Sequence, residues 1–175
     1  DDDYFEFLRS CELRIELLPL QEEYHKPVYE LAQRTNQMNF SGNKYTREEI
    51  AAIENNDQLD TYVIRSHDKF GEYGIVGFGI VDKNANQLID LMFSCRIQSK
   101  RVEHAFFTHL LDKYLPAGDF FVRYRKTERN KFTGQVFDDF GFEVAEKDKQ
   151  GILLMKFSRE KEPLNDGIVN VFSAL

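Results

Sequence analysis

Hydrophobic and polar residues follow two different periods along this chain. In several short stretches every second residue is apolar, as in Cys11, Leu13, Ile15 and Leu17, and this alternation predicts half-buried β-strands. In longer stretches an apolar residue recurs every three or four positions, which predicts amphipathic helices. The strands are predicted at 11–17, 61–67, 73–81, 88–95, 119–124, 142–145 and 152–157.

Helix signals fill the intervals between these strands. Thr46 and Glu49 form a capping box, in which each side chain can bond the backbone N–H of the other residue, so a helix should begin there. Gly141 stops the last helix. The helix around Pro27 is expected to begin properly near that residue, since proline is tolerated in a first turn. The helices are predicted at 4–9, 21–37, 47–55, 99–115 and 130–140.

The resulting element order, β-α-α-β-β-β-α-β-α-β-β, describes one α/β domain over residues 11–158. Antiparallel strands followed by a crossover helix give a mixed, mostly antiparallel sheet with helices on both faces. This order resembles that of the GNAT acyltransferase fold. Residues 1–10 are expected to be a leading helix or linker from a missing N-terminal domain, and residues 159–175 form a tail that the pattern does not place.

Composition narrows the functional classes. Hydrophobic residues make up 42% of the 175 residues, and the formal net charge of −7 argues against general nucleic-acid binding, which needs a basic surface. No apolar run approaches the ~20 residues that cross a membrane. Cys11 and Cys95 show no spacing typical of a zinc site or a disulfide framework. We therefore expect no metal, and a reducing, cytoplasmic compartment.

The resemblance to the GNAT fold implies a cofactor site just before the crossover helix. In that fold two central parallel strands splay apart and the pantetheine arm of coenzyme A lies between them. The pyrophosphate binds backbone amides at the start of the crossover helix. The stretch expected to bind it here contains Arg96, Ser99, Lys100 and Arg101. Ser99 and Arg101 replace the usual small residues, so either these side chains contact the phosphate or the stretch is a solvated helix start.

A second group of cations follows the predicted strand at 119–124. Arg123, Arg125 and Lys126 would lie at the same edge of the sheet as the first group if the two strands are neighbours. Such a basic rim suits an anionic partner, namely coenzyme A, phosphopantetheine or an acidic carrier protein. The alternative is a solvated strand end whose charges are balanced by nearby carboxylates.

Candidates for catalysis are few. GNAT enzymes often place a tyrosine four residues before a Gly-Phe pair to protonate the leaving thiolate, but Phe137 occupies that position here, and Tyr124 is the available substitute. Cys95 ends its strand and is a candidate acyl-accepting nucleophile, although a buried structural cysteine is the commoner role. Asp90 lies within an apolar strand, where a carboxylate is either a base or a structural hydrogen-bond acceptor.

Several stretches together resemble the C-terminal domain of FkbH-like proteins. The resemblance covers most of residues 4–157, with Met38 where that family usually has Phe. The stretches that carry it include Arg34-Thr35-Asn36-Gln37-Met38-Asn39, Lys44-Tyr45-Thr46, Ile89-Asp90, Ser94-Cys95-Arg96, Val102-Glu103, Asn130 and Gly141-Phe142. FkbH-like proteins join a HAD-type phosphatase-like domain to this GNAT-like domain, and they load a glyceryl unit onto an acyl carrier protein.

The resemblance implies an acyltransferase-like domain that binds the thioester of coenzyme A or of carrier-bound phosphopantetheine. An acyl carrier protein and the missing HAD-type domain would be its partners. Asn130 would contribute to cofactor binding. The polar loop would line the acyl or acceptor pocket, although an asparagine-rich loop is also simply a hydrogen-bonded turn. The alternative function is a catalytically degenerate module that docks a partner. The loop residues concerned are Arg34, Asn36, Gln37 and Asn39.

Overall fold

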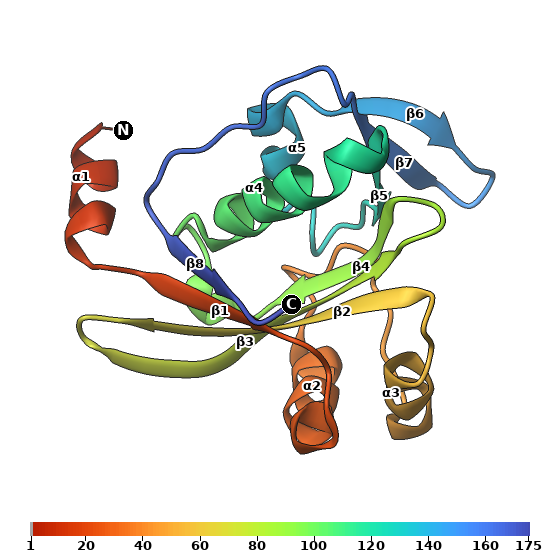
Figure 1. Ribbon diagram of the computed structural model, residues 1–175, viewed down its shortest axis with the longest axis horizontal. Coiled ribbons are helices and arrows are strands. Elements are labelled where there is room, and N and C mark those ends of the chain that lie inside the picture. Colours follow the sequence, from red (N-terminus) through yellow and green to blue (C-terminus); the bar gives the residue numbers. More distant parts are fainter. Residues whose placement is uncertain (1) are drawn as a thin grey trace.

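An eight-stranded mixed sheet runs through the molecule in the order β6-β7-β5-β4-β3-β2-β1-β8 (Figure 1). The computed structural model describes residues 2–175. Neighbouring strands are antiparallel except for two parallel pairs, β4 with β5 and β1 with β8. The strands are β1 (Arg14–Leu18), β2 (Leu59–Asp68), β3 (Gly71–Asp82), β4 (Gln87–Phe93), β5 (Phe120–Arg125), β6 (Glu143–Lys147), β7 (Ile152–Phe157) and β8 (Asn170–Ser173).

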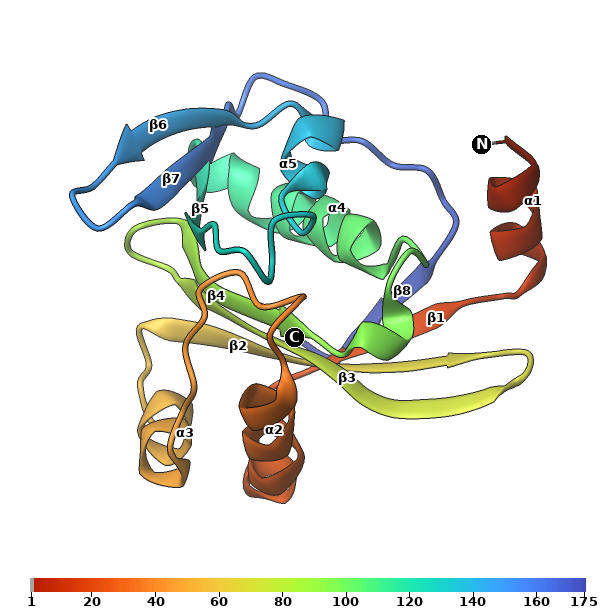
Figure 2. The ribbon, with the colours of Figure 1, turned by 180° about the vertical axis from the view of Figure 1, so that it is seen from behind.

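Helices cover both faces of this sheet. Figure 1 shows α2 (Glu22–Arg34) and α3 (Arg47–Glu54) on the lower face, and α4 (Val102–Tyr114) and α5 (Gln135–Phe140) on the upper face. The view from behind in Figure 2 shows the same layers, with α1 (Asp2–Ser10) at the side of the molecule. No helix within residues 2–175 is long and apolar enough to span a membrane.

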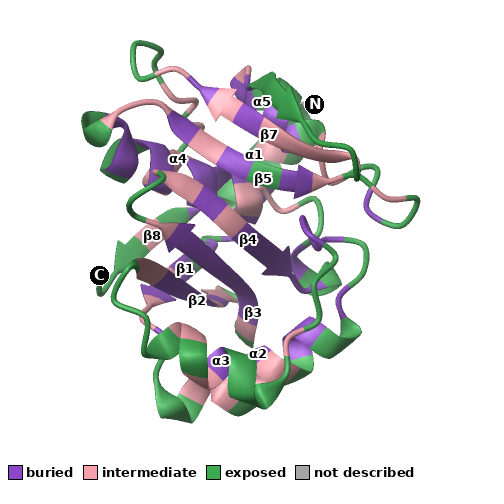
Figure 3. Ribbon diagram, turned by 90° about the vertical axis from the view of Figure 1, so that its right-hand side faces the viewer, coloured by how far each residue is buried: buried purple, intermediate pink, exposed green. Residues whose placement is uncertain are grey.

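Each face of the sheet has its own core, because successive residues of a strand point to opposite faces. In β4, Leu91 and Phe93 join the core that includes residues of α4 and α5, while Met92 joins the core that includes residues of α2 and α3. Figure 3 shows these central strands as buried and the outer surfaces of α2 and α3 as largely exposed. The predicted sheet with helices on both faces is therefore confirmed.

The starts of α2 and α5 differ from the sequence prediction for identifiable reasons. α2 begins at Glu22, so Pro27 lies inside the helix instead of near its start. The helix lacks one backbone hydrogen bond there, because proline has no N–H. α5 begins at Gln135 and not at residue 130, because the side chain of Asn130 bonds backbone groups of the preceding turn. The predicted capping box at the start of α3 is confirmed.

The C-terminal tail is part of the same fold. β8 pairs in parallel with β1 and forms one edge of the sheet. Ile168 and Val169, just before this strand, are buried in the core that includes α4. The strand itself is mostly exposed, so it lacks the regular apolar alternation that identifies half-buried strands from sequence.

Gly77 lies where β3 passes closest to a side chain of β4. A Cβ atom at this residue would lie 2.7 Å from Cδ1 of Phe93 and 3.0 Å from Cδ1 of Ile64, whereas at Gly79 the nearest atom would be 3.1 Å away. We expect Gly77→Ala to lower the free energy of unfolding by about 1–3 kcal/mol, because a packed core has no room for the methyl group. Gly79→Ala should cost less. Chemical denaturation compares the two variants, and equal losses would contradict the packing argument.

Candidate functional site

The two central parallel strands, β4 and β5, pair only near their first residues. Gln87 lies opposite Phe121 and Leu88 lies opposite Val122, and no further pairing of these strands occurs within residues 2–175. Beyond these pairs the strands separate toward their C-terminal ends. This gap is the place where the resemblance to the GNAT fold predicts the pantetheine arm of a cofactor.

The chain fills this gap with its own backbone. Residues 38–40, called the inserted segment below, belong to the loop between α2 and α3 and lie antiparallel to β4. The N–H of Phe40 donates to the carbonyl of Leu91 over 2.9 Å. The N–H of Phe93 donates to the carbonyl of Met38 over 2.9 Å. The inserted segment therefore uses the main-chain groups on the open edge of β4.

Phe40 also connects the inserted segment to β5. Its carbonyl accepts the N–H of Arg125 over 2.8 Å, so one residue bridges the two separated strands. Its ring is buried and packs against the rings of Tyr124, Phe107 and Phe137, with centroids 5.8–6.0 Å apart. The inserted segment is thus held by side-chain packing as well as by backbone hydrogen bonds.

Asp90 anchors the loop that follows the inserted segment. Its carboxylate is 1% exposed and accepts hydrogen bonds from the side chains of Ser41, Asn43 and Tyr45. Burial and the charge of Asp90 raise the pKa of the Tyr45 hydroxyl, which therefore remains a donor at neutral pH. Asp90 does not line the large pocket described below. This arrangement favours the structural role of Asp90 over the catalytic one.

Asn130 anchors the inserted segment from the β5 side. Its side-chain N–H groups donate to the carbonyls of Asn39 (2.8 Å) and Arg125 (2.8 Å), and its side-chain oxygen accepts the N–H of Thr127 (2.6 Å). Both amide hydrogens are therefore used within the protein, and the residue is 1% exposed. The expected contribution of Asn130 to cofactor binding is corrected accordingly: it positions the loop instead.

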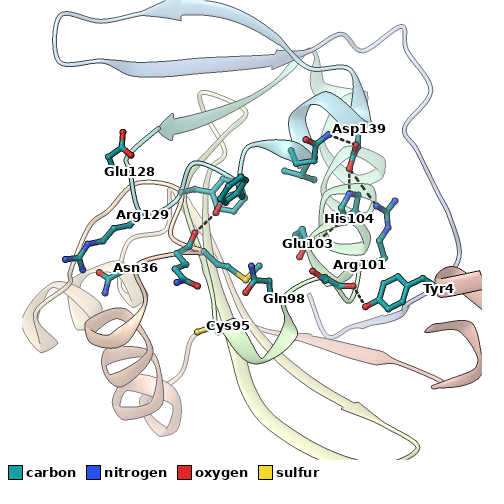
Figure 4. A pocket seen from close by; sticks show the side chains of 18 of the residues that line it. Tyr4, Asn36, Cys95, Gln98, Arg101, Glu103, His104, Glu128, Arg129 and Asp139 are labelled. Atoms are coloured by element: carbon teal, nitrogen blue, oxygen red, sulfur yellow. Dashed lines mark hydrogen bonds and ion pairs between the residues drawn. The ribbon is translucent and has the colours of Figure 1, made fainter. Parts of the chain in front are cut away.

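A pocket of about 1030 Å³ opens beside the inserted segment. It lies among the start of α4, α5, the loop at 128–133 and α1 (Figure 4). Met38 and Phe40 form part of its wall. Cys95 also lines the pocket. This residue is exposed and begins the one-turn helix Cys95–Ile97 that follows β4. The pocket therefore joins the inserted segment to a free thiol.

The loop after α2 contributes several polar side chains to this pocket. Arg34, Asn36 and Gln37, which the sequence predicted to contact substrate, all line it. Asn39 does not, because its side chain is buried and its oxygen accepts the N–H groups of Ser41 (3.1 Å) and Gly42 (2.8 Å). The hydrogen-bonded turn that the sequence left open as an alternative therefore describes Asn39.

The start of α4 keeps an unusual backbone shape. Ser99 and Arg101, which stand where small residues were expected, have φ values of 62° and 66°. This left-handed conformation costs a residue with a side chain about 1–2 kcal/mol. Both residues line the pocket. The Arg101 guanidinium, however, lies 2.9 Å from the carboxylate of Asp166 and 3.7 Å from that of Asp139, so its charge is already paired.

The other two cations predicted to bind phosphate lie away from the pocket. The ammonium group of Lys100 lies 4.6 Å from the ring centre of Tyr73. The side chain of Arg96 is exposed and contacts Ser94. Neither Arg96 nor Lys100 lines the pocket. The predicted set of phosphate ligands at the start of α4 is therefore reduced to backbone groups, Ser99 and the paired Arg101.

A network of charged side chains closes the α4 side of the pocket. The ring nitrogens of His104 both contact carboxylates, since Nδ1 lies 3.0 Å from Glu103 and Nε2 lies 2.8 Å from Asp139. Burial opposes the ionisation of Asp139, but the hydrogen bonds from His104 and Gln135 and the charge of Arg101 lower its pKa overall. Asp139 is therefore an anion at neutral pH, which disfavours a second anion on this side.

The remaining predicted residues lie outside the large pocket. Tyr124 is buried, packs against Phe137 and donates to a backbone carbonyl 3.5 Å away. Burial raises the pKa of Tyr124, and its hydroxyl does not line the pocket, so the predicted role as a proton donor is not supported. Arg123 and Arg125 line a separate cavity of about 30 Å³. Lys126 is exposed and lines neither cavity.

Sequence reasoning missed the acidic network of the pocket. Glu103, His104 and Asp139 line the pocket together, and so does Arg129. The only local signal was a carboxylate next to a histidine in the first turn of a helix. The pairing with Asp139 joins two helices, and no sequence period predicts such a contact.

Several solved structures with a similar arrangement of helices and strands are acetyltransferases. The ribosomal-protein-S18-alanine N-acetyltransferase from Escherichia coli has a TM-score of 0.60 and 11% identity, over 87% of this chain and 97% of that chain. An acetyltransferase from Thermus thermophilus has a TM-score of 0.66 and 10% identity, over 85% and 99% of the two chains.

A third similar structure contains the cofactor. It is a GNAT superfamily phosphinothricin acetyltransferase from Sinorhizobium meliloti in complex with AcCoA, with a TM-score of 0.58 and 12% identity over 86% of this chain and 93% of that one. The chain has the GNAT acetyltransferase fold. The predicted fold class is therefore confirmed, and at these identities the likeness establishes the fold alone. No protein-family model matches the chain, and no curated protein matches it by sequence.

Replacement of Asp90 by Asn should loosen the inserted segment. An amide NH₂ would face donor groups of the loop, and a buried donor that loses its acceptor costs about 1–3 kcal/mol. We expect a lower free energy of unfolding and faster hydrogen exchange at the N–H groups of Phe40 and Phe93. Asp57→Asn is the control, because Asp57 is exposed in the turn before β2. Unchanged exchange at both N–H groups in Asp90→Asn would contradict the anchoring role.

Ser99→Gly should stabilise the protein by about 1 kcal/mol, because glycine adopts the left-handed conformation without the steric cost of a Cβ atom. The carbonyl of Ser99 accepts the Tyr4 hydroxyl over 2.6 Å, and this backbone contact is retained in the variant. Ser99→Ala is the matched control, since it removes the hydroxyl and keeps the strain. Thermal and chemical unfolding measure both variants. The strain argument fails if alanine stabilises as much as glycine does.

Proposed function

We propose that this GNAT domain is an acyltransferase in which Cys95 receives the acyl group of a thioester. The observation that carries the proposal is the exposed thiol of Cys95 in a pocket of about 1030 Å³ at the end of β4. A buried structural position, which is the commoner situation for a cysteine, does not describe this residue. An accessible thiol at the wall of a large pocket is the arrangement that covalent acyl transfer requires.

The inserted segment supports a covalent route over direct transfer through the gap. The carbonyl of Leu91 and the N–H of Phe93, on the open edge of β4, are already bonded to residues 38–40. A pantetheine arm in the gap would have to displace these bonds, and each buried group left without a partner costs about 1–3 kcal/mol. Transfer onto Cys95 requires only that the thioester reach the open pocket.

The proposed step is a thioester exchange. The sulfur of Cys95 attacks the carbonyl carbon of the donor thioester, a new sulfur–carbon bond forms, and the donor's own sulfur–carbon bond breaks. The proton of the Cys95 thiol ends on the released donor thiol, so the step needs no oxidant or reductant. A second nucleophile then enters through the same opening and takes the acyl group from Cys95.

The donor or acceptor that we favour is the phosphopantetheine arm of an acyl carrier protein, in a protein of the FkbH-like type that loads a glyceryl unit. Three of the sequence stretches that resemble this family supply pocket residues. These residues are Arg34, Asn36, Gln37 and Met38 from the first stretch, Cys95 from the second and Glu103 from the third. Arg123, Arg125 and Lys126 make no ion pair within residues 2–175 and are available to an acidic carrier. A HAD-type domain would be the second partner.

A partner-docking module without catalysis is the second candidate. Phe137 packs in a cluster of aromatic rings and has no proton to donate to a leaving thiolate. At the start of α4, Arg101 is paired with two carboxylates. These observations favour the loss of direct acetyl transfer by the usual GNAT route. They do not argue against acyl transfer to the thiol of Cys95.

Incubation with thioesters tests the proposal. We expect acetyl-CoA or an acylated carrier protein to add one acyl group to the wild type, and peptide mass spectrometry to locate it on Cys95. Cys95→Ser should take up none, whereas Cys11→Ser should react like the wild type, because Cys11 is only 5% exposed. Acylation that persists in Cys95→Ser would overturn the assignment. A wild type that reacts with neither thioester would leave the docking module as the better account.

A further inference from the structure

The charged side chains of the pocket lie on two sides of it. Figure 4 shows Arg101 and Asp139 on the side of α4, and Arg129 with Asn36 on the opposite side, near α2. Cys95 lies between these two sides in the same view. The two sides differ in how far their positive charges are already neutralised.

On the α4 side the positive charges have carboxylate partners. Arg101 contacts Asp166 at 2.9 Å and Asp139 at 3.7 Å, and its side chain is only 15% exposed. The imidazole of His104 lies between the carboxylates of Glu103 and Asp139. This side therefore offers little uncommitted positive charge to an anionic ligand.

On the opposite side two arginines are uncommitted. Arg34, the last residue of α2, and Arg129 both line the pocket and are exposed. Neither makes an ion pair within the described residues 2–175. Glu128 lines the pocket as well, but it pairs with neither arginine.

Lys44 is a third cation on the side of the pocket near α2. The ammonium group of Lys44 donates to the carbonyls of Gln33 (3.1 Å) and Thr35 (2.8 Å), so it covers the carbonyl end of α2. Burial, and after it the charge of Arg129, lower the pKa of Lys44. Lys44 and Arg129 are thus close enough to repel each other, and an anion placed between α2 and the loop at 128–133 would relieve this repulsion.

We propose that Arg34 and Arg129 form an anion subsite that holds a phosphate group of the pocket's ligand, in place of the start of α4. The proposal rests on the proposed acyl transfer for the nature of the ligand. Guanidinium groups bind phosphate through pairs of parallel N–H···O bonds. The phosphate belongs either to the phosphopantetheine arm or to a small phosphorylated acyl unit. In both cases the other end of the ligand extends toward Cys95.

Calorimetric titration with inorganic pyrophosphate tests the subsite without an acyl group. We expect the wild type to bind pyrophosphate at low ionic strength, where charge attraction is least screened. Arg34→Gln and Arg129→Gln should each weaken binding about tenfold, as expected for the loss of a charge-assisted hydrogen bond. Arg96→Gln is the matched control, because Arg96 is exposed and adjacent to Cys95 but does not line the pocket. It should leave the affinity unchanged.

Three results would overturn the subsite. These are no binding of pyrophosphate to the wild type, unchanged affinity in both pocket variants, and an equal loss of affinity in Arg96→Gln. Because Arg34 and Arg129 are exposed, the variants should unfold at the wild-type temperature, and a thermal scan checks this. Arg129→Lys keeps the charge without the paired N–H groups and should bind with an intermediate affinity.

Two organic ligands distinguish the sources of the phosphate. Tighter binding of 4′-phosphopantetheine than of pantetheine, lost in Arg129→Gln, assigns the subsite to the donor arm. Tighter binding of glycerol 3-phosphate than of glycerol, lost in the same variant, assigns it to a phosphorylated acyl unit. The test of the anion subsite and the test of acyl transfer to Cys95 can fail independently. A protein that binds pyrophosphate through Arg34 and Arg129 but never acylates Cys95 has the subsite without the proposed reaction.

Discussion

Main-chain groups at the open edges of β4 and β5 need hydrogen-bond partners where the two strands separate. A buried N–H or carbonyl without a partner costs about 1–3 kcal/mol, so the gap has to be filled by a ligand, by water or by the protein itself. In this protein residues 38–40 fill it, and Phe40 bonds to both strands. The two halves of the sheet are thereby connected through a loop that also forms a wall of the pocket.

The remaining polar residues around the gap support this arrangement. Asp90 accepts hydrogen bonds from three side chains of the loop after the inserted segment. Asn130 donates to the carbonyl of Asn39 in that segment and to the carbonyl of Arg125 in β5. Both side chains are almost fully buried, so their hydrogen bonds form in surroundings where an unpaired polar group is costly. Asp90 and Asn130, which the sequence selects as catalytic and cofactor-binding, therefore support the site in this fold.

The filled gap bears on the acyl transfer proposed above. Direct transfer between two ligands that meet in the gap requires the inserted segment to leave. A thiol in the wall of the pocket needs no such movement, and Cys95 is exposed and lines that wall. The positive charges of the pocket also differ between its two sides. The start of α4 has its arginine paired, whereas Arg34 and Arg129 remain uncommitted on the opposite side of a domain whose formal net charge is −7.

Local patterns in the sequence were enough to determine the element order, the two faces of the sheet and the capping box of α3, because each depends on residues that are neighbours along the chain. Local stretches also selected Cys95 and Arg34, both of which line the pocket. The sequence alone did not place β8, whose exposed edge position leaves no apolar alternation.

Only the tertiary structure decided how the polar residues are used. The burial of Asp90 among loop donors, the pairing of Arg101 with Asp139 and Asp166, and the insertion of residues 38–40 all join segments that lie far apart in the chain. A charged or amide side chain has several partners of similar strength available. Which partner the side chain contacts depends on the packing of distant elements, and the hydrophobic period of the sequence does not predict that packing.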